Sequence, residues 1–226
     1  YGKGTASGTR ARGVDIYSTH EELLTRDDID IVFVCTPDHW HAAVANAAMK
    51  AGKDVYCEKP LTLTVREGRV LVETARRHGR VLQTGTQQRS NKSFRKAAEI
   101  VRNGWIGDIK LIRTRLGEFP VAANLPEEPI PADFNYDRWL GQAPKAPYTA
   151  KRCHTNFRWI YDYSGGQLPD IGAHFNDLAQ WGNGTELSGP LAYEGRAEFP
   201  KEGLFNTPVR YHVEATYGDG VKLIFH

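Results

Sequence analysis

The sequence predicts an α/β protein in which a parallel sheet is followed by an α+β part with a mainly antiparallel, open sheet. Three short apolar strands alternate with amphipathic helical segments in the first part, at 30–35, 54–57 and 81–84. This alternation is typical of a parallel doubly wound sheet. After Gly85 the pattern changes, and apolar residues alternate with polar ones at 109–116, as in an antiparallel strand with one exposed face. Three later strands are expected at 191–199, 209–217 and 221–225, with Asp219-Gly220 as a hairpin turn.

Local signals support each element of the first part. The strand at 30–35 is apolar throughout, so we expect both of its faces to be covered. Thr36-Pro37-Asp38 ends that strand and opens a helix that closes at Gly52. Thr64 and Glu67 have the spacing of a capping box, which predicts the start of the next helix.

The pattern divides the chain into two expected domains, residues 1–86 and residues 87–226. The second begins with a helix at about 93–102, followed by a proline-rich connection over 117–151 with a short helix near Tyr136–Leu140. A connection of that length is unusual in a compact domain and is often functional.

A phosphate-binding Gly-x-Gly-x-x-Gly turn does not follow any of the predicted strands. The stretch from Gly2 to Gly8 is rich in glycine, but its spacing differs and no strand precedes it. The last strand also stops in mid-hairpin at His226. We therefore expect the sequence to be a fragment that lacks its start and its end.

The composition excludes several classes of partner. With 29 Lys and Arg, 27 Asp and Glu and a net charge of +2, the chain is too balanced for nucleic acid or an anionic membrane as partner. No apolar run approaches the length of a membrane helix. The three cysteines, Cys35, Cys57 and Cys153, have no paired spacing, so we expect buried, inert thiols rather than a disulfide framework or a zinc site.

The first chemical signal is Glu58-Lys59-Pro60, directly after the strand at 54–57. Ligands of open α/β sheets bind just outside the carboxyl ends of the strands, and an amine held there can act on a bound ligand. A solvated lysine in a strand-to-helix loop fits the same position.

The second signal is Asp170 with His174, which share one face if this stretch is a helix. A histidine beside a carboxylate has its tautomer and orientation fixed, and it suits a general base near neutral pH. A surface Asp–His pair, a satisfied core histidine and a metal site remain alternatives. The metal site is the weakest of them, since no further ligands can be placed.

Other polar residues fall at related positions. His39 and His41 flank Trp40 after the strand at 30–35, and Gln87 and Arg89 follow the strand at 81–84. These positions lie at the same sheet edge, although plain helix-start residues would look alike. His154, Asn156 and Arg158 alternate with other residues, which fits either the wall of a pocket for a polyhydroxylated ligand or an edge strand.

With these segments the chain resembles the Gfo/Idh/MocA oxidoreductases, the relatives of glucose–fructose oxidoreductase and inositol dehydrogenase. The resemblance rests on Thr36-Pro37-Asp38-His39-Trp40-His41, Glu58-Lys59-Pro60 and Gly165-Gly166…Asp170…His174, and runs from about residue 14 to 226. It implies the later part of a Rossmann-type dinucleotide-binding domain, followed by an α/β domain for substrate binding and oligomerisation. It also implies NAD or NADP as cofactor.

The resemblance and the strand-end positions together give a set of expected site residues. The catalytic residues are Lys59, Asp170 and His174. The cofactor-binding residues are Thr36, Pro37, His39, His41, Glu58, Lys59, Pro60 and Gln87. The substrate-binding residues are Lys59, Arg89, His154, Asn156, Arg158, Asp170 and His174, and no metal is expected.

The expected reaction is hydride transfer between the nicotinamide and a secondary alcohol of a sugar, cyclitol or related polyol. His174 would take the hydroxyl proton, and Lys59 would face the developing alkoxide in the same crevice. Two alternatives stay open: glycoside cleavage by transient oxidation and elimination, and a non-catalytic binding or assembly module. The resemblance further implies a homo-oligomer, a dimer or tetramer, through the C-terminal sheet. The compartment is undecided, with the cytoplasm favoured over the periplasm or export.

Overall fold

The computed structural model describes residues 14–117 and 119–226, so the glycine-rich stretch from Gly2 to Gly8 lies outside the described residues. The chain forms two compact units, each built from two segments. The first unit combines Tyr1–Gly85 with Pro126–His154, and the second combines Thr86–Leu125 with Thr155–His226. The expected division at residue 86 follows the order of the chain and leaves residues 126–154 in the second domain. In the structure these residues group with the first unit.

The first unit is built on a three-stranded parallel sheet. Its strands are β1 (Ile31–Val34), β2 (Asp54–Cys57) and β3 (Leu82–Thr84), in the order β1-β2-β3. β1 and β2 pair in parallel over their full length, and β2 and β3 pair from Val55 with Leu82 onward. The predicted parallel sheet is confirmed.

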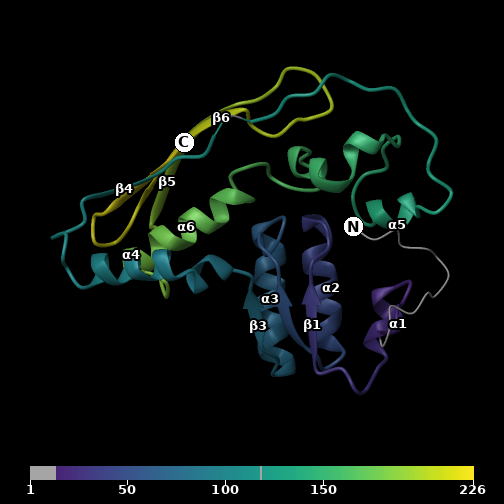
Figure 1. Ribbon diagram of the computed structural model, residues 1–226, viewed down its shortest axis with the longest axis horizontal. Coiled ribbons are helices and arrows are strands. Elements are labelled where there is room, and N and C mark those ends of the chain that lie inside the picture. The colour runs from purple at the N-terminus through teal and green to yellow at the C-terminus, as the bar shows by residue number, and fades with distance from the viewer. Residues whose placement is uncertain (1–13, 118) are drawn as a thin grey trace. The chain divides into compact units, whose positions relative to one another are not determined.

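Helices α2 (Asp38–Lys50) and α3 (Val65–His78) make the two crossovers of this sheet. Both connections run in the same direction along the sheet, so right-handed crossovers place both helices on one face; Figure 1 shows the two helices side by side next to the strands. The Thr64–Glu67 capping box begins α3, and Gly79 ends it with φ 59°. The core beneath the helices contains Val34, Ala45, Ala48, Met49, Val55, Cys57 and Leu71.

Among its described residues, the first unit also contains α1 (His20–Leu24), α5 (Tyr136–Leu140) and the 3₁₀ turn η2 (Ala150–Arg152). α5 lies where the proline-rich connection was expected to contain a short helix. The connection is tied down by aromatic packing, with Tyr136 stacked on Trp139 and in edge contact with Tyr148.

The expectation that both faces of the first strand are covered is wrong. Ile31 is 56% exposed and Phe33 is 68% exposed, whereas Val34 is 1% exposed. The reason is that α2 and α3 both lie on one face, so that among the described residues the alternate side chains of β1 are left open.

The second unit contains a four-stranded sheet with two helices packed against each other. Its strands are β4 (Leu111–Thr114), β5 (Ala192–Glu198), β6 (Arg210–Thr216) and β7 (Lys222–Phe225), in the order β4-β7-β6-β5. α4 (Lys92–Arg102) contacts α6 (Ile171–Gly182), and α6 contacts β4. The inner face of the sheet, with Tyr211, Ala215, Leu223 and Phe225, forms the core with Leu116 and Ala179.

Two expectations for this unit need correction. β4 pairs in parallel with β7, whereas an antiparallel strand was expected. The one-sided apolar pattern of residues 109–116 indicates that one face of the strand is covered, but it does not indicate the direction of the strand. Residues His154–Trp159 form a 3₁₀ helix, η3, instead of an edge strand. In the remaining pairs, β5–β6 and β6–β7, the strands are antiparallel as predicted, and Gly220 makes the expected turn with φ 83°.

Neither a membrane helix nor a metal cluster occurs in the described part of the chain. No helix there is long and apolar enough to cross a bilayer. No group of three or more His, Cys, Asp or Glu side chains there is arranged to hold a metal ion.

Candidate functional site

The Glu58-Lys59-Pro60 segment leaves the carboxyl end of the middle strand of the parallel sheet. The Glu58 amide donates to the Val34 carbonyl at 2.9 Å, and the Gly85 amide donates to the Cys57 carbonyl at 2.7 Å. The ends of all three strands are therefore hydrogen-bonded around this segment. Lys59 follows in a partly buried position, and the Lys59–Pro60 peptide bond is cis.

Gly85 allows the end of β3 to approach this segment closely. A Cβ atom at residue 85 would lie 3.0 Å from Glu58 Cα and 3.2 Å from the Cys57 carbonyl oxygen. Because both neighbouring atoms belong to backbone, a larger residue would push the Glu58–Lys59 turn away from β3.

His41 joins the two loops that follow β1 and β2. Its Nδ1 lies 2.7 Å from the Pro60 carbonyl oxygen, and its Nε2 lies 2.9 Å from the Thr36 carbonyl oxygen. The side chain is 1% exposed. Of the residues expected at the cofactor site, the structure therefore brings Thr36, His41 and Pro60 together through hydrogen-bonding contacts.

A pocket of about 650 Å³ lies beside Thr36 and Pro37 within the first unit. Aromatic rings and small polar groups line it, including Tyr17, Ser18, Thr19, Trp40, Phe134, Asn135 and Trp139. The hydroxyl of Thr36 is buried and has no hydrogen-bond partner among the described residues. A polar atom of this kind at the carboxyl edge of a parallel sheet is available to a ligand.

His39 lies away from this pair of loops. Its Nε2 is 2.9 Å from the Trp139 carbonyl oxygen, which also accepts a hydrogen bond from Trp40 Nε1 at 3.0 Å. Burial lowers the pKa of His39, an effect that the hydrogen bond to Trp139 partly offsets. With its side chain 1% exposed, His39 links α2 to the α5 segment.

In the second unit the structure brings Asp170 and Arg158 together. Arg158 Nε lies 3.2 Å from Asp170 Oδ2, and Asp170 is 9% exposed. Asp170 is the residue before the first turn of α6, and His174 follows in that turn, where it is partly buried. Asp170 thus lies just outside α6, and a shared face of Asp170 and His174 stays a prediction.

Arg89 makes a two-pronged ion pair within the second unit. Its Nε and Nη2 donate to the two carboxylate oxygens of Asp177 at 2.8 and 2.6 Å, and its guanidinium lies over the Trp181 ring at 5.3 Å. Sequence reasoning did not select Asp177, although it lies three residues after His174 on the same helix. That spacing was the available signal.

The remaining expected residues lie on short 3₁₀ turns. Gln87 begins η1 (Gln87–Ser90), while His154, Asn156 and Arg158 belong to η3. Alternate residues of a 3₁₀ helix do not share a face, so the three polar residues of η3 do not form one wall. His154 itself has a positive φ of 52°.

The cysteines differ in accessibility. Cys57 and Cys153 are fully buried, and burial raises their pKa values to about 12 and about 11. Cys35 is exposed, contrary to the expectation of a buried thiol. All three are free thiols.

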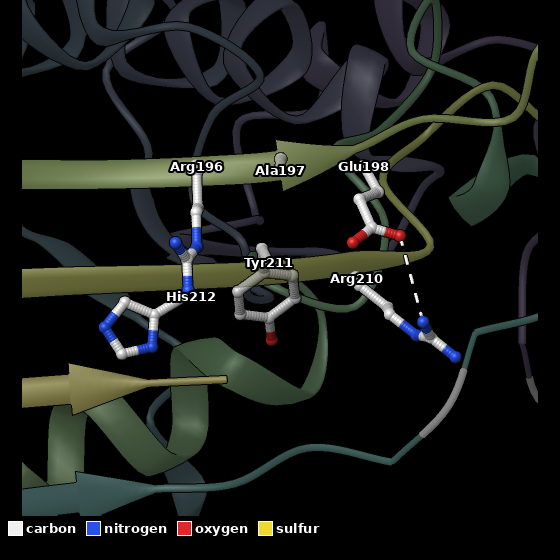
Figure 2. Close-up of a pocket in the computed structure, with 6 residues that line it drawn as sticks. All are labelled: Arg196, Ala197, Glu198, Arg210, Tyr211 and His212. Atoms are coloured by element: carbon white, nitrogen blue, oxygen red, sulfur yellow. Dashed lines mark ion pairs between the residues drawn. The ribbon is translucent and has the colours of Figure 1, made fainter.

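A second depression, of about 240 Å³, lies at the end of the β5–β6 ribbon (Figure 2). Arg196 stands opposite His212 in the strand register, and an ion pair of 3.9 Å joins Arg210 to Glu198. None of the expected site residues lines this depression.

Two family models match the chain. One is described as the oxidoreductase family, NAD-binding Rossmann fold, and matches residues 5–86. The other is described as the oxidoreductase family, C-terminal alpha/beta domain, and matches residues 117–226. Both carry the name Gfo/Idh/MocA.

Individual proteins agree with these models. A myo-inositol 2-dehydrogenase of Thermotoga maritima is 34% identical over 97 residues, which cover 43% of this chain and 29% of that protein. Glycosyl hydrolase family 109 protein 1 of a Shewanella strain is 52% identical over 59 residues, which cover 26% and 13%.

Among solved structures, an oxidoreductase domain protein from Kribbella flavida aligns with a TM-score of 0.63 and 29% identity, over 92% of this chain and 50% of that one. The chain thus spans half of that structure and less than a third of the two curated proteins.

Proposed function

Because the chain belongs to the Gfo/Idh/MocA oxidoreductase family, we propose that the complete protein is an NAD- or NADP-dependent oxidoreductase. Its reaction is hydride transfer between the nicotinamide and a secondary alcohol of a sugar, cyclitol or related polyol. The observation that carries the proposal is Glu58-Lys59-Pro60 at the carboxyl end of the middle parallel strand, in a sheet that matches the NAD-binding family model.

The residues present fit a dinucleotide at this edge. The buried, unpartnered hydroxyl of Thr36 and the aromatic pocket beside it supply a hydrogen-bonding group and flat apolar surfaces. Thr36, Pro37 and the backbone of the Glu58–Pro60 turn would hold the cofactor, which when bound supplies the hydride acceptor or donor.

The chain's own residues have three roles in this proposal. His174 takes the proton of the substrate hydroxyl. Asp170, paired with Arg158 at 3.2 Å, orients the imidazole. Lys59 places its ammonium beside the oxygen that gains negative charge, an interaction that strengthens as the transition state forms.

Steady-state kinetics of the complete enzyme test these roles. His174→Ala should lower kcat by about 10²–10⁴-fold, the usual contribution of general acid–base catalysis. Lys59→Ala should also lower kcat, while both variants retain cofactor binding. Exposed Lys110→Ala, outside the proposed site, serves as the matched control. Unchanged turnover in both site variants would refute the assignment.

A second candidate is glycoside cleavage by transient oxidation and elimination. The 52% identity to a glycosyl hydrolase family 109 protein favours it, although the match covers only 59 residues. In this reaction the hydride returns to the product, so a glycoside is cleaved without net accumulation of NADH. Product analysis alongside absorbance at the NADH band separates the two reactions. A folded complete protein that binds neither NAD nor NADP would favour a non-catalytic module.

We also infer that the complete protein self-associates through the four-stranded sheet. Every residue of the edge strand β5 is exposed, and Leu191, Tyr193 and Phe199 in and beside it present 79%, 67% and 51% of their surface. Exposed apolar side chains along a sheet edge are typical of a surface that another protein chain covers. Light scattering should find a dimer or tetramer that Tyr193→Asp weakens and the surface control Lys110→Glu leaves intact; a monomeric parent would refute the inference.

A further inference from the structure

We propose that His41 is a positioning residue that fixes the Lys59 turn by clamping two loops together, and that it does so without touching the cofactor. The proposal rests on the proposed function for its catalytic consequence, but its structural basis stands on the geometry of the first unit alone.

The clamp joins three elements. His41 is the fourth residue of α2, a helix whose inner face is anchored in the core by Ala45, Ala48 and Met49, each 0% exposed. From this fixed position the imidazole reaches the Thr36 carbonyl after β1 and the Pro60 carbonyl after β2. A rigid helix therefore sets the separation of two loops at the carboxyl ends of neighbouring strands, where a bound ligand would lie.

The side chain has no surface left for a ligand. It is 1% exposed, and both of its ring nitrogens already face carbonyl oxygens at 2.7 and 2.9 Å. The role expected from the family resemblance, lining the cofactor cleft, is thereby replaced by an indirect one.

The form of the ring determines how many of the two contacts are hydrogen bonds. A carbonyl oxygen only accepts hydrogen bonds, and a neutral imidazole has one N–H. Both contacts are hydrogen bonds only when both nitrogens carry hydrogen, as in the imidazolium.

The consequence for Lys59 follows from its position in the chain. Lys59 directly precedes the clamped Pro60, and on its other side Glu58 is hydrogen-bonded to Val34. Loss of the contact between His41 and the Pro60 carbonyl would leave one side of the Lys59 turn unrestrained. A misplacement of about 1 Å at a reacting group can lower the rate by about 10²-fold.

Two substitutions in the complete enzyme test the clamp. His41→Leu removes both contacts, and His41→Gln keeps one amide donor. We expect kcat to fall about 10- to 100-fold in His41→Leu and by less in His41→Gln, with the Kd for NAD changed far less than kcat. A merely structural role would lower the melting temperature without this difference between kcat and Kd.

Lys53→Met is the matched control. Lys53 is 8% exposed, and its ammonium donates to the Arg26 carbonyl at 2.6 Å, at the opposite end of β2. The Lys53→Met variant therefore loses a comparable buried hydrogen bond to a carbonyl, far from Lys59. The stability of this variant should fall while its kcat is retained. An equal loss of kcat in Lys53→Met and His41→Leu would overturn the proposal.

Amide hydrogen exchange gives a test that is independent of turnover. The amides of Lys59 and Leu61 should exchange faster in His41→Leu, while that of Asp54 is unchanged. Unchanged exchange at both amides would overturn the clamp. A parent that lacks turnover would refute the proposed function and leave the exchange result to decide the clamp.

Discussion

At the scale of single residues, His39 and His41 show how two similar positions take different tasks. Both lie in the first turn of α2 and both are 1% exposed. His39 contacts the carbonyl of Trp139, whereas His41 contacts the carbonyls of Thr36 and Pro60. The sequence shows only the spacing of the two rings around Trp40, and the carbonyl that each one meets is determined by tertiary structure.

The buried His39 should make the stability of the protein fall in mildly acidic solution. Burial lowers its pKa in the folded state, so the unfolded chain binds the proton more readily. The contribution is therefore fully present above the unfolded pKa of about 6.5 and is lost as the pH falls below it. One such proton changes the free energy of unfolding by at most about 1.4 kcal/mol per pH unit.

Chemical denaturation at pH 7.5 and pH 5.5 measures this effect. His39→Gln should show a smaller difference between the two pH values than the parent, because its side chain does not titrate. The carboxylates of Glu21 and Glu186, whose pKa values are lowered by backbone and arginine contacts, respond only in more acidic solution. An identical pH dependence in parent and variant would contradict the prediction.

At the scale of elements, the sequence predicted the boundaries that local chemistry decides. The Thr64–Glu67 capping box and Gly79 determine where α3 begins and ends, and both can be recognised in the sequence. The direction of β4 could not be predicted from the sequence, because its partner β7 lies at the other end of the second unit's sequence. The polar alternation at 154–158 left a pocket wall and an edge strand open, and the segment forms a 3₁₀ helix, which so short a pattern does not distinguish from a strand.

Gly141 is required where the α5 segment packs on Trp40. A Cβ atom there would lie 2.3 Å from Trp40 Cζ2, and the residue has a φ of 55°. Gly52, with φ 79° and nothing within 4 Å of a Cβ atom, also has a positive φ but lacks the clash. Gly52→Ala should cost about 1–2 kcal/mol. Gly141→Ala should cost about 1–3 kcal/mol more, because the indole must shift and because a ψ of −119° places Gly141 outside the left-handed helical region. Equal losses in urea denaturation would refute the contact.

The Arg89–Asp177 pair ties η1 to α6. Both side chains are partly buried, at 32% and 17% exposure, and the bonds are bidentate. Asp177→Asn should lower the free energy of unfolding by about 1–2 kcal/mol, as for loss of a charge-assisted hydrogen bond. A double-mutant cycle with Arg89→Gln should give a coupling energy of about 1 kcal/mol. Additive losses would mean that the pair contributes no net stability.

At the scale of the whole molecule, the two units are each assembled from segments separated in the chain. The long connection joins the first unit because the Trp139 carbonyl is held by His39 and Trp40. No local pattern in the sequence marks this return, since it depends on contacts about 100 residues apart. The candidate site follows the same rule: strand-end position predicted Lys59 and the family resemblance predicted Thr36, but the His41 clamp and the partner of Arg89 needed coordinates.

Cofactor choice is a property of the complete protein, and thermal denaturation can measure it. A ligand that binds only the folded state stabilises it by about 2.7 kcal/mol at a concentration one hundred times its Kd. We expect NAD or NADP to raise the melting temperature of the parent, and the nucleotide with the larger shift at equal concentration is the preferred one. Lys59→Ala should retain the shift while losing turnover, because its ammonium acts on the substrate oxygen. Loss of the shift in Lys59→Ala would instead assign Lys59 to cofactor binding.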